Sequence, residues 1–174
     1  MIVNGLSFVE YISEKEMDSI IGKLATEVQE ATKDKNPLFI VMLNGAFIFA
    51  SDFLRKLNFP AETYFLKYSS YQGTSSTGEV MTSPISDIVK DRNIVVLEDI
   101  VDSGLTMDIF RKELEKKCPK SVLIVSMLSK PQARKVDVKI DYIGREIDNK
   151  FVLGMGLDYD GVGRNLKSIY IKEK

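Results

Sequence analysis

Histidine is absent from the 174-residue sequence, and only one cysteine, Cys118, is present. Without imidazole, Ser-His-Asp and Cys-His catalysis and histidine-dependent zinc sites are excluded. A single thiol forms neither an intrachain disulfide nor a thiolate metal cage, so we expect a reducing, cytoplasmic location. Any general base must therefore be a carboxylate, a lysine or a tyrosine, and any metal should be a hard cation held by oxygen, such as Mg²⁺.

The sequence also lacks a large net charge and a long apolar run. Lys and Arg number 24 against 25 Asp and Glu, which gives no general attraction to nucleic acid or to a membrane surface. No apolar stretch approaches the roughly 18 residues that span a bilayer, and the N-terminus lacks a signal-peptide pattern. With 44% apolar residues, no repeat and no linker, the chain is expected to form one domain over residues 1–174. A local cationic site for a small polyanionic substrate is compatible with the neutral overall charge.

Apolar periodicity predicts alternating helices and strands. Ser13 and Glu16 form a capping-box pattern before a helical face that reaches Val28. Another helix is expected between Gly45 and Asn58. Strands are expected at residues 38–43, 62–67, 93–99 and 121–128, and a third helix at residues 106–117. This order favours an α/β fold, a mainly parallel twisted sheet flanked by helices.

Two further stretches have their own signals. Residues 68–84 are rich in Ser, Thr and Gly and predict a long loop; loops beyond about 12–15 residues often act as lids or binding loops. Gly154 and Gly156 flank Met155 without the third glycine of a dinucleotide fingerprint, so we expect close backbone packing there.

The segment 94–106 is the most informative about chemistry. An apolar strand runs into Glu98 and Asp99, and a turn with Asp102 and Gly104 leads into a helix. Ligands of parallel sheets bind beyond the carboxyl ends of strands, and helix N-termini bind phosphate. Acids beside a phosphate would repel it unless they hold sugar hydroxyls or Mg²⁺. The pattern therefore indicates a phosphorylated sugar, although a strand–turn–helix corner with solvated acids is the competing interpretation.

The order of these residues resembles the phosphoribosyl pyrophosphate (PRPP) motif of the type I phosphoribosyltransferases. The resemblance implies that family's fold, with a small hood built from about residues 1–12 and 137–174. It implies Mg²⁺ as cofactor, with Glu98 and Asp99 as metal ligands, and Asp102 as the general acid/base. The implied PRPP-binding residues are Glu98, Asp99, Asp102, Ser103, Gly104, Leu105 and Thr106.

Other segments resemble the hypoxanthine–guanine branch of that family and imply a pyrophosphate site. Asn44 and Gly45 match a short loop that contacts pyrophosphate, although the family usually has lysine where Asn44 stands. The family carries a cis peptide here, so we predict one between Leu43 and Asn44. Ser70 and Tyr71 resemble a Ser-Tyr pair on a closing loop, for which a plain polar surface loop is the alternative. Arg164 matches the family's pyrophosphate-binding arginine.

The same resemblance implies a purine site. Lys130 matches a lysine that donates to the 6-oxo group, and Tyr142 a stacking ring beside the Ile143 carbonyl. A solvated lysine and a tyrosine packed in the core are the alternatives. Asn149 is also expected at the purine site. It stands where many relatives have an aspartate that helps bind a second Mg²⁺. An amide oxygen is a poorer ligand for a hard cation than a carboxylate, so the sequence leaves open whether a second Mg²⁺ binds.

The implied activity is conversion of hypoxanthine or guanine and PRPP to IMP or GMP and pyrophosphate. A xanthine-preferring transferase, and a non-catalytic regulator that senses PRPP or nucleotides on the same fold, are the alternatives. The family resemblance also implies a homodimer or homotetramer. The sequence does not rank hypoxanthine, guanine and xanthine as substrates.

Overall fold

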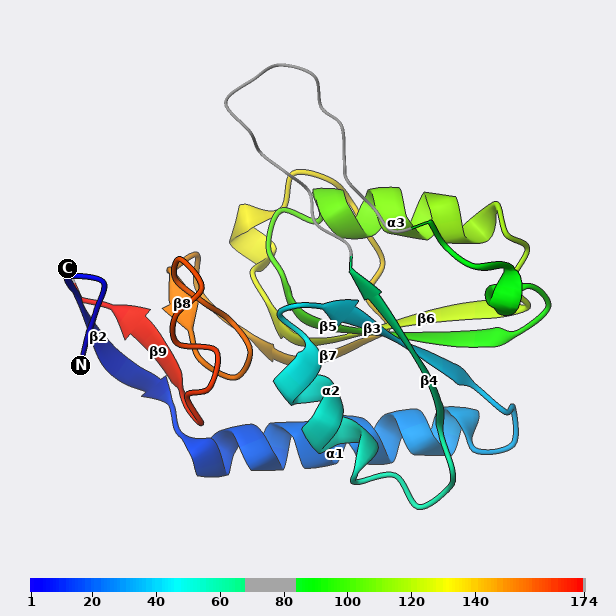
Figure 1. Ribbon diagram of the computed structural model, residues 1–174, viewed down its shortest axis with the longest axis horizontal. Coiled ribbons are helices and arrows are strands. Elements are labelled where there is room, and N and C mark those ends of the chain that lie inside the picture. Colours follow the sequence, from blue (N-terminus) through cyan, green and yellow to red (C-terminus); the bar gives the residue numbers. More distant parts are fainter. Residues whose placement is uncertain (68–83, 174) are drawn as a thin grey trace.

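A five-stranded parallel sheet forms the centre of the molecule in the computed structural model, which describes residues 1–67 and 84–173 (Figure 1). Its strand order is β4-β3-β5-β6-β7. The strands are β3 (Leu38–Leu43), β4 (Glu62–Lys67), β5 (Asn93–Val101), β6 (Ser121–Ser129) and β7 (Tyr142–Glu146). Every neighbouring pair runs parallel, which confirms the predicted sheet.

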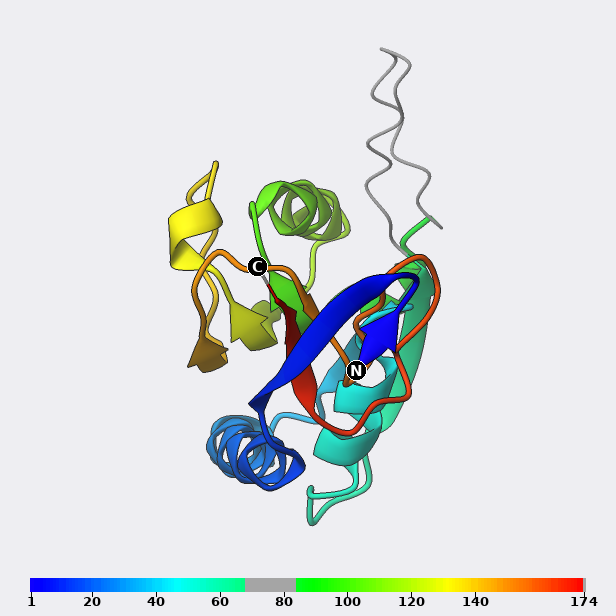
Figure 2. The ribbon, with the colours of Figure 1, turned by 90° about the vertical axis from the view of Figure 1, so that its left-hand side faces the viewer.

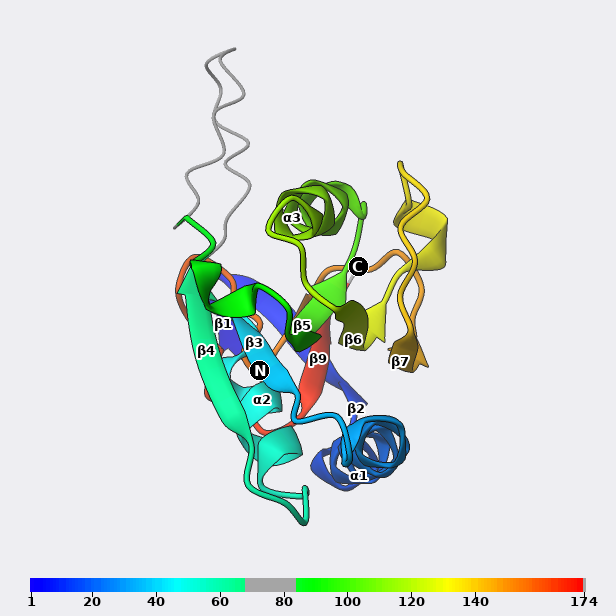
Figure 3. The same ribbon diagram turned by 90° about the vertical axis from the view of Figure 1, so that its right-hand side faces the viewer.

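Helices cover both faces of this sheet. Figure 3 shows α1 (Glu14–Thr32) and α2 (Phe47–Leu54) on one side and α3 (Leu105–Glu115) on the other. Short 3₁₀ turns lie at η1 (Asp87–Val89) and η2 (Pro131–Ala133). Among the described helices, none combines the length and hydrophobicity needed to cross a bilayer.

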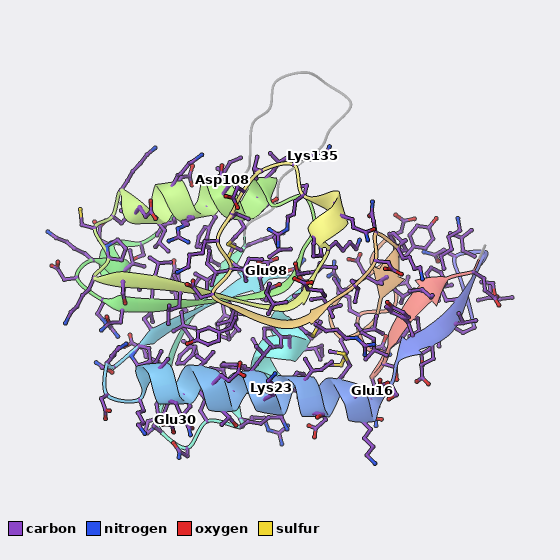
Figure 4. All side chains as sticks on the ribbon, turned by 180° about the vertical axis from the view of Figure 1, so that it is seen from behind. Glu16, Lys23, Glu30, Glu98, Asp108 and Lys135 are labelled. Carbon is purple, nitrogen blue, oxygen red and sulfur yellow. The ribbon has the colours of Figure 1, made fainter. Side chains whose placement is uncertain are left out.

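The first helix begins at the predicted capping box. The Ser13 hydroxyl accepts from the Glu16 amide, and the Glu16 carboxylate accepts from the Ser13 amide, which stabilises the helix start by about 1 kcal/mol. The apolar face of α1 is buried against the sheet. Glu16, Lys23 and Glu30 project from α1 in Figure 4.

The strand predictions are close to the observed bounds. Residues 38–42 are fully enclosed, as expected for a strand covered on both faces. The third and fourth predicted strands extend by two residues and one residue, to Val101 and Ser129. The second helix ends at Leu54, well before Asn58. The amides of Lys56 and Leu57 donate to the carbonyls three residues earlier, Phe53 and Leu54, and this 3₁₀-type pattern replaces the α-helical one.

A second, antiparallel sheet forms the hood at one end of the molecule, where both chain termini meet (Figures 1 and 2). Its strands, in spatial order, are β1 (Ile2–Val3), β2 (Leu6–Ile12), β9 (Ile169–Lys172) and β8 (Val152–Leu153). Because β7 belongs to the central sheet, the C-terminal part of the hood begins after Glu146 and not at residue 137 as expected.

Close backbone contacts occur within the hood and between the hood and the loop after β3. A Cβ atom at Gly156 would lie 1.9 Å from the Gly45 carbonyl oxygen, and one at Gly154 would lie 2.1 Å from the Ser168 carbonyl oxygen. Both glycines have positive φ, +101° and +105°, which disfavours any side chain. The expected close packing at this pair is confirmed. As a result, the segment around Gly156 rests directly on the loop after β3.

Candidate active site

The carboxyl ends of β3, β5 and β6 bring the expected residues to one edge of the sheet. The register pairs Val41 with Leu97 and Val101 with Ser129. The loop at Asn44, the acids at the end of β5 and Lys130 after β6 therefore share this edge. The peptide between Leu43 and Asn44 is cis, which confirms the sequence prediction.

Glu98 and Asp99 form an enclosed carboxyl pair beside Gly45. Asp99 is 7% exposed, and its Oδ1 accepts from the Ile100 amide at 2.8 Å. Glu98 Oε2 is enclosed without a hydrogen-bond partner among the described residues. Figure 4 shows Glu98 inside the molecule, between the sheet and the layer of α3.

The electrostatics of this pair follow from its enclosure. Burial raises the pKa of Glu98 well above its usual value, and the neighbouring Asp99 raises it further. Burial also raises the pKa of Asp99, although hydrogen bonds and the charge of Arg164 oppose that shift. A bound cation would remove this repulsion. No group of three or more potential metal-ligating side chains occurs in the described part of the chain. Two carboxylates completed by substrate and water oxygens suit Mg²⁺.

Glu98→Gln is expected to stabilise the metal-free fold at high pH. Because the folded pKa of Glu98 is raised, its stabilising contribution is complete below the unfolded pKa and is lost as pH rises through the folded value. Glutamine stays neutral, so its advantage over the wild type should grow with pH. Urea unfolding with a chelator at pH 5 and pH 8 measures this. The exposed Glu10→Gln controls for net charge, and an equal Glu98→Gln effect at both pH values would contradict the expectation.

The turn after β5 leads directly into α3. Gly104 has φ +81° and is the N-cap residue of this helix, and the Ser103 hydroxyl accepts from the Leu105 amide at 3.4 Å. The conformation requires glycine and leaves the first amides of α3 directed out of the helix end. Residues 102–106 therefore present backbone amides at the N-terminus of α3, an arrangement that favours an anion.

Asp102 and Lys130 meet at this turn. Lys130 Nζ lies 2.7 Å from Asp102 Oδ2, and the lysine side chain is 8% exposed against 50% for the aspartate. The alternative of a solvated lysine is thereby excluded. The lysine amide also donates to the Val101 carbonyl at 3.0 Å, which holds the end of β6 against the end of β5. A proton acceptor and a cationic donor thus lie side by side.

Arg164 reaches the same region from the hood. Its guanidinium donates to the Gly156 carbonyl at 2.8 Å and pairs with Asp158 at 2.7 Å. Its positive charge opposes the rise in the pKa of Asp99 that burial causes. The hood therefore supplies a cation near Asp99, next to the Gly156 segment that rests on Gly45.

The structure does not bring Tyr142 and Ile143 to this edge. Tyr142 pairs with Val125, four residues before Ser129, and packs against the main core. Ile143 pairs with Ser126 within the sheet. The sequence interpretation is wrong about their position, because the β7 register places them in mid-sheet. Asn149 is exposed, two residues after Ile147, whose amide donates to the Ser129 carbonyl at 2.8 Å. Ser70 and Tyr71 lie outside the described residues.

Sequence reasoning assigned no site role to Phe151, or to Asp158, which pairs with Arg164 at 2.7 Å. Phe151 is 46% exposed, and its ring meets the Tyr159 ring edge-on at 5.5 Å. Phe151 lies on the segment that follows β7. This segment passes Lys130 as it leaves the central sheet, because the Ile147 amide donates to the carbonyl of Ser129, the residue before Lys130. An aromatic residue just after a strand end was a visible signal, but Tyr142 offered the same residue type in a competing register.

The chain resembles known proteins over most of its length. Residues 10–160 match the model of the phosphoribosyl transferase domain. The chain is 38% identical to a hypoxanthine-guanine phosphoribosyltransferase of Bacillus subtilis, over 91% of this chain and 89% of the relative. It is 36% identical to a hypoxanthine-guanine-xanthine phosphoribosyltransferase of Tritrichomonas foetus, over 91% and 88%.

Solved structures resemble the fold over nearly its whole length. A hypoxanthine phosphoribosyltransferase of Staphylococcus aureus has a TM-score of 0.88 at 30% identity, covering 98% of this chain and 93% of that chain. A hypoxanthine-guanine phosphoribosyltransferase of Bacillus anthracis has a TM-score of 0.86 at 29% identity, covering 97% and 98%.

Proposed function

The chain belongs to the phosphoribosyltransferase family, and we propose that it joins hypoxanthine or guanine to the ribosyl 5′-phosphate of PRPP, with release of pyrophosphate. The 2.7 Å contact between Asp102 and Lys130 is the observation that carries this proposal. N7 and the 6-oxo group are neighbours on one edge of an oxopurine, so an adjacent acceptor and donor match that edge. The proposal includes a cytoplasmic enzyme that assembles as a homodimer or homotetramer.

PRPP would bind across the end of β5. Its 5′-phosphate would accept from the α3 amides and the hydroxyls of residues 102–106. Its ribose hydroxyls would face Glu98 and Asp99, which would also hold Mg²⁺, directly or through water. Its pyrophosphate would lie between Asn44-Gly45 and Arg164, with Ser70 and Tyr71 expected to close over it. The ion, when bound, supplies charge neutralisation for the departing pyrophosphate.

The purine would lie against Lys130 and Asp102. The ammonium donates to a 6-oxo group but has nothing to accept from a 6-amino group, which disfavours adenine. As pyrophosphate leaves, positive charge develops on the anomeric carbon, and N9 attacks that carbon. Asp102 holds or removes the proton at N7 as general acid/base.

Phe151 is a better candidate than Tyr142 for the stacking ring. It is the exposed aromatic on the segment that leaves the sheet beside Lys130, whereas Tyr142 packs in mid-sheet. Stacking contributes about 1–3 kcal/mol per base. Phe151→Leu is therefore expected to raise the KM for guanine by about 5- to 150-fold, with the KM for PRPP little changed. Steady-state kinetics with each substrate varied measures both constants.

Tyr142→Leu is the matched comparison for this prediction. It removes a ring of similar size that packs against the core, so it should lower the free energy of unfolding without a selective change in the guanine KM. A selective rise in the guanine KM with Tyr142→Leu, and none with Phe151→Leu, would show that Tyr142 is the stacking ring and Phe151 is not.

A spectrophotometric assay with PRPP, Mg²⁺ and single bases tests the proposed function. We expect turnover with hypoxanthine and guanine and none with adenine. Since one relative's name includes xanthine, xanthine belongs in the same assay. A xanthine-only signal would favour the xanthine-preferring alternative. Nucleotide binding without pyrophosphate release for any base would favour the non-catalytic regulator and overturn the proposal.

A further inference from the structure

Arg134 lies behind the proposed phosphate turn, in a segment that the proposed reaction does not use. Its Nη1 lies 3.3 Å from the position of a Cβ atom on Gly104, and its Nη2 donates to the Ser129 hydroxyl at 3.0 Å. Ser129 is the last residue of β6, directly before Lys130. One guanidinium therefore contacts both the turn that starts α3 and the strand end that carries Lys130.

The segment around Arg134 is fastened to this turn by its backbone and its side chains. The Lys135 amide donates to the Ser103 carbonyl at 2.9 Å. Val136 and Val138 approach Gly104 from the same side as Arg134, at 3.3 and 3.0 Å from the position of its missing Cβ. Figure 4 shows Lys135 on the α3 side of the sheet. Residues 134–138 thus form a backing for the turn, on the side where glycine leaves room.

The cost of placing Arg134 here suggests a role beyond packing. Its Nε is enclosed without a hydrogen-bond partner among the described residues, and an enclosed unpaired donor is destabilising. Burial lowers the pKa of Arg134, while the nearby acids Asp102, Glu146 and Asp137 oppose that shift. An apolar residue would back the glycine without the unpaired donor, but it would bring no positive charge to the turn.

We propose that Arg134 is a positioning residue, which fixes the phosphate turn relative to the end of β6 and adds positive charge behind the bound 5′-phosphate. This inference rests on the proposed function, since it assumes that the turn at Gly104 receives the phosphate. Its consequence is selective: Arg134 would support the 5′-phosphate, while the pyrophosphate would bind at Gly45, which contacts Asp99, and at Arg164. A purely structural arginine would not separate the two anions.

Calorimetry of ribose 5-phosphate and of Mg–pyrophosphate binding tests this selectivity in Arg134→Gln. We expect ribose 5-phosphate affinity and the KM for PRPP to worsen roughly ten-fold, the scale of one lost charged contact, and pyrophosphate affinity to stay within two-fold. Arg134→Lys keeps the charge without the forked contact and should recover part of the loss. Lys139→Gln, on an exposed side chain paired with Asp141, removes the same charge and should match the wild type.

The outcomes separate this inference from the proposed function. Ribose 5-phosphate affinity within two-fold of the wild type in Arg134→Gln, or equal losses for both anions, would overturn the role of Arg134. A wild-type protein that binds no ribose 5-phosphate and shows no turnover would instead overturn the proposed function. If Arg134→Gln does not fold, Ser129→Ala decides, because it removes only the hydroxyl that anchors Nη2. It should reproduce a smaller loss with the same selectivity, and no loss would contradict the role.

Discussion

Asp102→Asn is expected to lower kcat by about 10²- to 10⁴-fold, the usual contribution of a general acid/base. Asparagine keeps the shape and still accepts a hydrogen bond from Lys130, which lies 2.7 Å from the native carboxylate. It cannot take the proton from N7. The 5′-phosphate contacts come from backbone amides and hydroxyls, so the dissociation constant of Mg–PRPP should change only a few-fold. Single-turnover kinetics and calorimetry measure the two quantities separately.

Asp108→Asn is the matched control for this variant. It removes a carboxylate from the first turn of the same helix, where Asp108 pairs with the exposed Lys112. The electrostatic change at the start of α3 is therefore similar, but no group near Lys130 is altered. Turnover by Asp108→Asn should stay close to that of the wild type. Near-normal turnover by Asp102→Asn would remove Asp102 from the catalytic role.

Gly45→Ala is expected to reduce kcat/KM for PRPP by about 100-fold. A Cβ atom there would lie 1.7 Å from Asp99 Oδ2, so either the carboxylate or the loop has to move. Displacements of about 1 Å at a reacting centre cost rate on this scale. The same overpacking should lower the free energy of unfolding by about 1–3 kcal/mol. Steady-state kinetics and urea unfolding measure the two effects.

Gly22→Ala provides the control for this second variant. Gly22 lies inside α1, and its added Cβ would meet only the Lys56 side chain at 4.0 Å. Alanine is favoured over glycine in a helix interior by about 0.5–1 kcal/mol, so this variant should be at least as stable as the wild type and fully active. Unchanged PRPP kinetics in Gly45→Ala would show that Asp99 does not need its observed position.

The sequence was most informative where local chemistry determines local structure. The capping box at Ser13 and the fully apolar run of β3 each have one structural solution, and both were predicted. The turn at Gly104 was predicted for the same reason, because a strand, acids, a small residue and a helix follow in an order with a physical meaning. The cis peptide after Leu43 came from family resemblance and not from local propensity.

The parts that the sequence did not reveal depend on long-range pairing. Whether Tyr142 or Phe151 reaches the site is decided by the register of β7 against β6, which no local pattern specifies. The hood pairs β2 with β9, so its formation depends on contacts between opposite ends of the chain. Arg134 follows a short 3₁₀ turn with no periodic pattern, and its contacts with Gly104 and Ser129 come only from folding.

Calorimetric titration of the protein with PRPP in the presence of Mg²⁺ tests the central claim most directly, namely that the turn at the start of α3 and the carboxylates of β5 bind one sugar phosphate together. The account predicts saturable binding at a single site per chain, competed by ribose 5-phosphate and weakened when Mg²⁺ is chelated. Failure to detect any PRPP binding, with the protein folded and Mg²⁺ in excess, would contradict it.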